Sequence, residues 1–162
     1  MKDATKILKI LEKDCRTTPA EIATMTGMTE EEVAAAAAAL EKENVIIGYT
    51  ALINWDRADE DAVTALIEVK VTPQFEAGYD RLASRIYQYE EVESLYLMSG
   101  AYDFCVIISG KSMKEVARFV IEKLAPINGV NSTATHFILH KYKEKGRLFG
   151  AKYNQEERPL FI

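Results

Sequence analysis

The sequence has few cysteines, few histidines and no apolar run long enough to cross a membrane. Cys15 and Cys105 stand far apart without Cys-x-x-Cys spacing, which favours reduced, packed thiols over a disulfide or a metal site. On a strand, His136 and His140 would lie about 13 Å apart, too far to share a metal ion. The opening "MKDATKILKI" has no uncharged stretch long enough for a signal peptide. We therefore expect a cytoplasmic chain with no bound metal and no cofactor.

Motifs for nucleotide binding and nucleophilic catalysis are also missing. The chain has no P-loop, no dinucleotide-binding glycine pattern and no recognisable pair of nucleophile and base. Its 48% hydrophobic and 28% charged residues are typical of a globular protein with a real core. We therefore expect a globular protein that is not an enzyme.

Positive charge is scarce and unevenly distributed. The net charge is −5, and residues 1–50 carry six basic against nine acidic side chains. From residue 141 to residue 158 the balance reverses, with six basic against three acidic residues. A solvated charged tail is the common meaning of such a run, and a local basic stripe is the alternative.

The stretch "TEEEVAAAAAAL", residues 29–40, predicts a helix. Thr29 is an N-cap type of residue, glutamates fill the first turn, where the helix dipole favours them, and alanines follow. A helical wheel of about 100° per residue turns one set inward: Val33, Ala36, Ala37 and Leu40. The outward set is Glu31, Ala34, Ala35, Ala38, Ala39 and Lys42. The outward face is therefore made largely of methyl groups.

Two shorter helices are predicted before it. One spans "ATKILKILEKD", residues 4–14, with apolar residues at helical spacing. The other lies in "TTPAEIATMTG", with Thr18 as cap, Pro19 at the first helical position and Gly27 as stop. Its inward residues are predicted to be Ile22, Ala23 and Met25. After the alanine helix, "NVIIGYTALINW", residues 44–55, alternates as a short hairpin or wing would.

Beyond a charged joint at residues 56–61, the pattern changes to alternating strands and helices. Strands are predicted at 62–71, 92–98, 104–109 and 131–143, and helices at 75–89 and 112–127. The first of these helices turns Tyr79, Leu82, Ala83 and Ile86 inward, and the second begins with a capping box of Ser112 and Glu115. The order βαββαβ predicts a ferredoxin-like antiparallel sheet with both helices on one face, so something else must cover the other face.

In this order, the helix-turn-helix, wing, linker and ferredoxin-like domain resemble the Lrp/AsnC (leucine-responsive, feast/famine) family of transcriptional regulators over residues 3–142. Local matches are "ILKILEKDCRTTPAEIATMTGMTEEEV", "LEKENVIIGYTALINW", "MSGAYDF" and "GVNSTATHFIL". The resemblance implies an α+β protein with a winged helix-turn-helix DNA-binding domain at 1–54 and a linker at 55–61. It further implies a ferredoxin-like effector-binding and oligomerisation domain at 62–142, followed by a tail at 143–162.

The resemblance also implies a function. Family members are transcriptional regulators that dimerise through their sheets, assemble further to tetramers or octamers, and bind an amino acid or similar small molecule between dimers. The corresponding effector-binding positions here are Ser99, Gly100, Ala101, Tyr102, Asp103, Thr133 and Thr135. Backbone N–H groups of a glycine turn suit a carboxylate, and Asp103 with threonine hydroxyls suits an ammonium group. In the alternative interpretation, "GAYD" is simply a tight turn whose aspartate bonds backbone amides.

The alanine helix departs from the family pattern. Its position is that of the recognition helix, where family members commonly carry arginine or lysine. Alanine neither neutralises phosphates nor donates hydrogen bonds to bases. The predicted contacts to double-stranded DNA are Arg16, Thr18, Thr29, Glu30, Ala34, Ala35, Ala38 and Lys42. We therefore expect DNA binding that is weak per protomer, sensitive to salt and dependent on the oligomer.

Other hypotheses remain open. The methyl face of the alanine helix also suits close packing against another helix, so the N-terminal domain could bind a protein partner instead of DNA. A haem-pathway enzyme on the same fold is the other alternative, although "SGAYDFC" and two histidines are a poor lining for a large anionic tetrapyrrole. The apolar end "RPLFI", residues 158–162, is predicted to dock on a neighbouring protomer.

Overall fold

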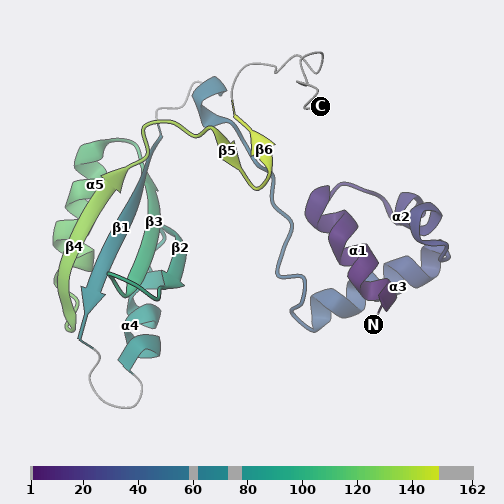
Figure 1. Cartoon of the computed structure of the whole chain (residues 1–162), viewed down its shortest axis with the longest axis horizontal. Helices are drawn as coiled ribbons and strands as arrows, with labels where there is room; N and C mark the ends of the chain where they lie inside the picture. Colours follow the sequence, from purple (N-terminus) through teal and green to yellow (C-terminus); the bar gives the residue numbers. More distant parts are fainter. Residues whose placement is uncertain (1, 59–61, 73–77, 150–162) are drawn as a thin grey trace, which may run out of the picture. The chain divides into compact units, whose positions relative to one another are not determined.

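A computed structural model describes residues 2–58, 62–72 and 78–149 of the chain (Figure 1). The chain divides into two compact units, Met1–Ile53 and Asn54–Ile162. Each unit has its own apolar core.

The first unit is built from α1 (Lys2–Lys13), α2 (Pro19–Thr26) and α3 (Glu30–Lys42). Its core consists of one or two apolar residues from each helix: Ile7, Ile22, Ala23 and Val33. Further apolar residues pack against this core from the same helices and the turn between α2 and α3: Ile10, Leu11, Met28 and Ala36. The predicted helices and their order are confirmed.

The ends of α2 and α3 are fixed by their own side chains. Thr18 accepts a hydrogen bond from the Glu21 amide at 3.3 Å, and the Glu21 carboxylate accepts one from the Thr18 amide at 2.8 Å. Thr29 and Glu32 repeat this capping box at 3.2 and 2.9 Å. Gly27 ends α2 with a φ of 76°, which glycine adopts without steric cost. Each capping threonine stabilises its helix by about 1 kcal/mol.

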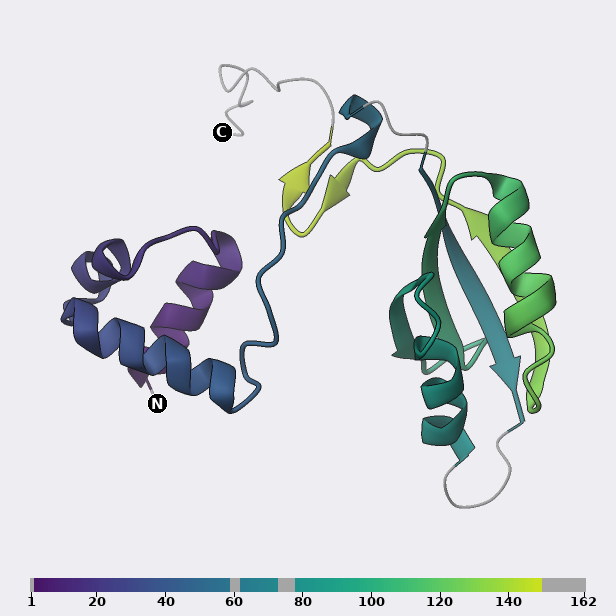
Figure 2. The same cartoon turned by 180° about the vertical axis from the view of Figure 1, so that it is seen from behind.

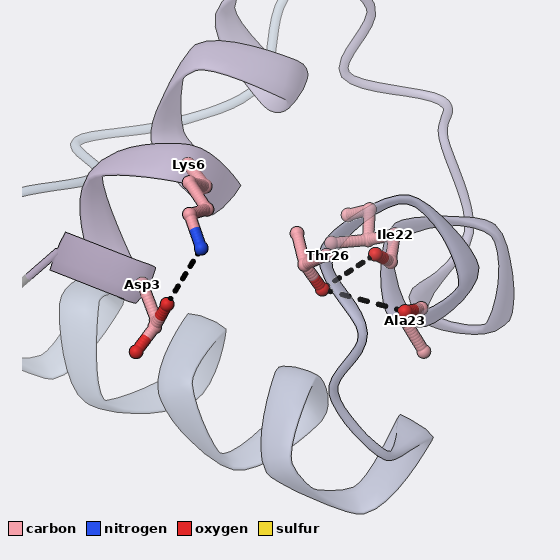
Figure 3. A network of polar contacts seen from close by, with 5 residues as sticks. All are labelled: Asp3, Lys6, Ile22, Ala23 and Thr26. Carbon is pink, nitrogen blue, oxygen red and sulfur yellow. Dashed lines mark hydrogen bonds and ion pairs between the residues drawn. The ribbon is translucent and has the colours of Figure 1, made fainter.

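The prediction that Met25 of α2 belongs to the core was wrong. Met25 is 66% exposed, and Met28 packs against the core instead. At about 100° per residue the inward face of α2 runs through Ile22, Ala23 and Thr26, which leaves Met25 pointing away from it. The Thr26 hydroxyl lies over that face and donates to the Ile22 carbonyl at 2.7 Å (Figure 3).

The predicted hairpin over residues 44–55 is not formed, since the structure assigns no strand anywhere in this described stretch. The chain leaves α3 through Asn44, whose φ is 55°, and continues without strand pairing as far as Asn54. Ile47 is 93% exposed, so one face of a hairpin here would lack cover. A hairpin without a packed face is at best marginally stable in water, which accounts for the difference. Cys15, predicted to be packed, is exposed beside this stretch.

The second unit contains a four-stranded antiparallel sheet with the strand order β2-β3-β1-β4. The strands are β1 (Val63–Val71), β2 (Val92–Leu97), β3 (Phe104–Gly110) and β4 (Val130–Phe137). The helices are α4 (Gly78–Tyr87) and α5 (Met113–Phe119), which continues as the π-helical turn η2 (Val120–Leu124). This is the predicted βαββαβ ferredoxin-like arrangement. Residues 75–77 of the predicted first helix lie outside the described residues.

Both helices pack on the same face of the sheet, in front of it in Figure 2. The core between them joins alternate residues of the central strands to apolar helix residues: Ala65, Ile67, Val69, Phe104, Val106, Ile108, Leu82, Ile86, Val116 and Phe119. The predicted capping box of α5 is half formed. Ser112 accepts from the Glu115 amide, but the Glu115 carboxylate accepts from the Lys111 amide at 2.6 Å.

The other face of the sheet, here called the open face, carries the intervening residues of the same strands: Thr64, Leu66, Glu68, Tyr96, Cys105, Ile107 and His136. His136 lies 3.4 Å from the Glu68 carboxylate. Cys105 is buried, as predicted, and burial raises the pKa of its thiol. Val106, on the opposite face of β3, is buried under the helices, whereas Ile107, which shares the open face with Cys105, is only half-buried.

The chain continues beyond β4 into a hairpin of β5 (Lys143–Glu144) and β6 (Arg147–Leu148), inside the stretch predicted as tail. His140 lies past the end of β4, so it does not share a strand with His136. Within the described residues, no group of three or more His, Cys, Asp or Glu side chains is arranged to hold a metal. In the same part of the chain, no helix is both long and apolar enough to span a membrane. The predicted docking segment at 158–162 lies outside the described residues.

Candidate functional site

The outward face of α3 is a strip of exposed alanines, as the helical wheel predicts. Ala34, Ala35, Ala38 and Ala39 are exposed, whereas Val33 is 1% exposed. Glutamates occupy the first turn of α3, and Lys42 is the basic residue of its last turn. This face therefore offers methyl contacts, with a positive charge only at its C-terminal end.

The remaining predicted DNA contacts differ in how free their side chains are. Thr18 and Thr29 hold the caps of α2 and α3, and two hydrogen bonds from Thr18 lower the pKa of Glu21. Arg16 is exposed in the turn between α1 and α2, where its amide donates to Asp14 at 3.0 Å. Lys6 is bound to Asp3 at 3.0 Å (Figure 3). The Asp3 carboxylate therefore offsets the positive charge of Lys6.

The predicted effector turn is tied to the end of β1 through Asp103. Asp103 Oδ2 accepts a hydrogen bond from the Val71 amide at 2.8 Å, and the Asp103 amide donates to the Val69 carbonyl at 3.0 Å. The Met98 amide closes the turn by donating to the Asp103 carbonyl at 2.7 Å. The carboxylate therefore bonds one backbone amide, that of Val71, in line with the structural interpretation of "GAYD", while each of its oxygens retains a further lone pair.

Tyr79, which sequence reasoning treated only as a core residue, also contacts Asp103. Its hydroxyl donates to Asp103 Oδ1 at 3.2 Å, and its ring packs edge-on against Phe104 with 5.9 Å between centroids. Burial and the Asp103 charge raise the pKa of Tyr79. A helical wheel alone could not find this contact, because Tyr79 and Asp103 are 24 residues apart.

The other predicted effector residues lie on or near the same end of the sheet. Thr133 pairs with Val69 on β1, the residue whose carbonyl binds the Asp103 amide, and Thr135 pairs with Ile67 further along. Ser99, Gly100 and Ala101 are exposed, whereas Tyr102 is half-buried. A hollow of about 250 Å³ lies elsewhere, between α5 and the end of β3, lined among others by Glu91, Glu115 and Lys123.

A helix-turn-helix unit joined to a ferredoxin-like domain of this strand order defines a transcriptional regulator with a ligand-binding domain. Residues 64–148 match the model of the Lrp/AsnC ligand binding domain, and residues 4–47 match that of winged helix-turn-helix DNA-binding proteins. The chain belongs to the Lrp/AsnC family of transcriptional regulators.

Individual proteins are similar to this chain in sequence or in fold. The chain is 51% identical over 146 residues to the HTH-type transcriptional regulator YugG of Bacillus subtilis (strain 168), covering 90% of this chain and 88% of that protein. A transcriptional regulator of Neisseria meningitidis, solved as its L-Met complex, shares the fold with a TM-score of 0.71 and 22% identity over 89% and 92% of the two chains. A feast or famine regulatory protein of M. tuberculosis, complexed with L-methionine, also has a TM-score of 0.71, with 24% identity over 88% and 94% of the chains.

Proposed function

We propose that this regulator binds double-stranded DNA through its first unit and responds to an amino acid bound beside the Asp103 turn, at an interface between dimers. The observation that carries the proposal is the Asp103 carboxylate, held at the end of β1 by Val71 and Tyr79. The relatives complexed with L-methionine support an amino acid as the effector. The proposed domain limits are those expected from the sequence, with the tail at 143–162, and the proposed location is the cytoplasm.

The chemistry of the turn suits a zwitterion. Asp103 accepts from Val71 and Tyr79 through different oxygens, so an ammonium group can still donate to their remaining lone pairs. Backbone amides of Gly100 and Ala101 are candidates for the carboxylate, because both residues are exposed. The exposure of residues 99–101 supports a site that a second dimer completes.

Self-association is proposed to begin at the open face of the sheet. Its central part is apolar, with half-buried Leu66 and Ile107 beside Tyr96, which is 53% exposed. Pairing two such faces would remove their apolar surface from water. Each Å² of apolar surface buried in this way stabilises the dimer by about 25 cal/mol. Assembly of the dimers to a tetramer or octamer would bring several α3 helices to one DNA molecule and multiply weak contacts.

DNA binding is proposed to be weak per protomer and sensitive to salt. Phosphate neutralisation supplies most nonspecific affinity, and the exposed face of α3 carries alanines where cations would serve this role. The α3 N-terminus can approach a phosphate, and alanine methyls can contact thymine methyls.

Binding of the full-length protein to a duplex containing its own upstream region tests the proposal. The dissociation constant is measured across a salt series and with each standard amino acid in turn. We expect specific binding that one amino acid changes by linkage between the effector and the assembly. Absence of binding to any duplex at low salt would refute the DNA-binding part. Absence of any amino-acid effect on DNA affinity, assembly or thermal stability would refute the effector part.

A protein partner for the first unit is the second candidate function, favoured by the exposed strip of Ala34, Ala35, Ala38 and Ala39. Small side chains permit close approach of another helix. Failure to bind DNA combined with an amino-acid-dependent rise in thermal stability would favour this candidate. The relatives are named as regulators, and we propose no catalytic role.

A further inference from the structure

The β5–β6 hairpin concentrates positive charge in an otherwise acidic protein. Residues 141–148, "KYKEKGRL", contain four basic residues and one acidic residue, in a chain with a net charge of −5. Lys143, Lys145 and Arg147 are all exposed. The single acidic residue, Glu144, lies 3.6 Å from Lys141, so one cation of the group already offsets its charge.

The hairpin has a defined geometry. Lys143 pairs with Leu148 and Glu144 with Arg147, and the Phe149 amide donates to the Tyr142 carbonyl at 2.9 Å. The turn residues Lys145 and Gly146 have φ values of 42° and 79°. Positive φ at both central positions is the type I′ geometry that matches the twist of a two-residue hairpin. This places Lys145 at the tip, with Lys143 two residues before it.

Aromatic and polar groups adjoin these charges. Tyr142 is 77% exposed, and its ring meets that of His140 edge-on at 4.6 Å between centroids. A tyrosine hydroxyl donates hydrogen bonds to phosphate oxygens in protein–DNA interfaces, as lysine and arginine do. The exposed groups of the hairpin therefore suit a polyanion.

We infer that the β5–β6 hairpin binds the phosphate backbone of DNA, as a second contact besides α3. The inference rests on the proposed DNA-binding function. The hairpin supplies the positive charge that the exposed face of α3 lacks, because the alanines of that face do not neutralise phosphates. Contacts of this kind position the protein on the duplex without reading its sequence.

A double variant, Lys143→Gln with Lys145→Gln, tests the inference in the full-length protein. The matched control is Lys111→Gln with Lys114→Gln, which removes the same charge from exposed residues at the start of α5. The probes are the duplex with the protein's own upstream region and a scrambled duplex of equal length. The dissociation constants are measured across a salt series, and the mass in solution shows whether assembly is unchanged.

We expect the hairpin variant to bind both duplexes more weakly than the wild type at low salt. The slope of log Kobs against log salt should become shallower by about 0.9 for each phosphate that is no longer neutralised, and hence by about 1.8 for two. The control variant should retain the wild-type slope. An equal weakening for both duplexes is expected, because phosphate contacts carry no sequence information.

An unchanged slope in the hairpin variant, or the same reduction in the control, would overturn the inference while leaving the proposed function intact. A hairpin variant that lowers the mass in solution with no change in slope would assign the hairpin to an acidic surface of a second copy, and would also overturn it. If the wild type binds neither duplex, both the inference and the proposed DNA binding are refuted.

Discussion

The Tyr79 hydroxyl lies 3.2 Å from the Asp103 carboxylate, which connects the first turn of α4 to the turn between β2 and β3. The same carboxylate holds the Val71 amide at the end of β1. One aspartate thus binds a helix and a strand that meet at this end of the sheet. The position of the Asp103 carboxylate therefore depends on both contacts.

Replacing Tyr79 with phenylalanine removes the hydroxyl and keeps the ring against Phe104. We expect weaker amino-acid binding, measured by calorimetry, because Asp103 loses the donor that orients Oδ1. The free energy of unfolding should fall slightly. Tyr87→Phe is the matched control, since that ring is 62% exposed and lies in the last turn of the same helix. Equal amino-acid affinity in wild type and Tyr79→Phe would show that the hydroxyl does not position Asp103.

Replacing Asp103 with asparagine removes the charge but keeps an oxygen for the Val71 amide. We expect the protein to stay folded and to lose most of its affinity for an amino acid, because the ammonium group loses its counter-charge. Asp103→Ala should also lower the free energy of unfolding by about 1–3 kcal/mol, since the Val71 amide is left without its acceptor. Calorimetry and urea unfolding separate the two effects. If Asp103→Asn binds the amino acid as tightly as the wild type, the Asp103 charge does not bind the effector and the turn has only a structural role.

Adding positive charge to α3 tests which partner its exposed face meets. For Ala35→Arg combined with Ala38→Arg, we expect tighter DNA binding and a salt slope steeper by about 0.9 for each additional phosphate neutralised. Ala117→Arg, on the exposed side of α5, is the control and should have no effect. The measurement is a salt series with the upstream duplex. A salt slope unchanged from the wild type in the double variant would contradict a DNA contact at this face.

The cap of α3 is expected to contribute to the stability of the first unit. Thr29→Ala removes the acceptor for the Glu32 amide, so the free energy of unfolding should fall by about 1 kcal/mol. Thr24→Ala is a control, because Thr24 lies within α2 and its hydroxyl bonds the Ala20 carbonyl of the same helix. Urea unfolding compares the variants. An equal decrease in the free energy of unfolding for Thr29→Ala and Thr24→Ala would show that the loss does not come from the cap.

Acid should weaken the contact between Glu91 and Lys123. The hydrogen bond from Lys123 holds the pKa of Glu91 below its usual value, so the contact stabilises the fold above the unfolded pKa of about 4.3. This contribution is lost as the pH falls through the lowered folded pKa. Because both side chains are more than a third exposed, it is under about 1 kcal/mol. Urea unfolding against pH should show Glu91→Gln less stable than wild type at neutral pH and equal to it in acid.

Much of the fold follows from local features of the sequence. Thr18 and Thr29 begin helices because their side chains bond the third amide that follows, and Gly27 ends one because glycine accepts positive φ. Alternation in β1 identifies its buried face in the same way, since strand side chains point to opposite sides in turn. The position of the effector turn came only from the family resemblance.

What the sequence alone determined is therefore the helices of both units, the four strands of the sheet, their order and the uncharged outer face of α3, because period and caps act over a few residues. Only the tertiary structure decided that Tyr79 meets Asp103, that Met28 replaces Met25 in the core, and that residues 44–54 form no hairpin. It also decided that Lys143 and Lys145 project from a hairpin. These outcomes depend on which groups the fold brings within a few ångströms, and spacing along the chain does not contain that information.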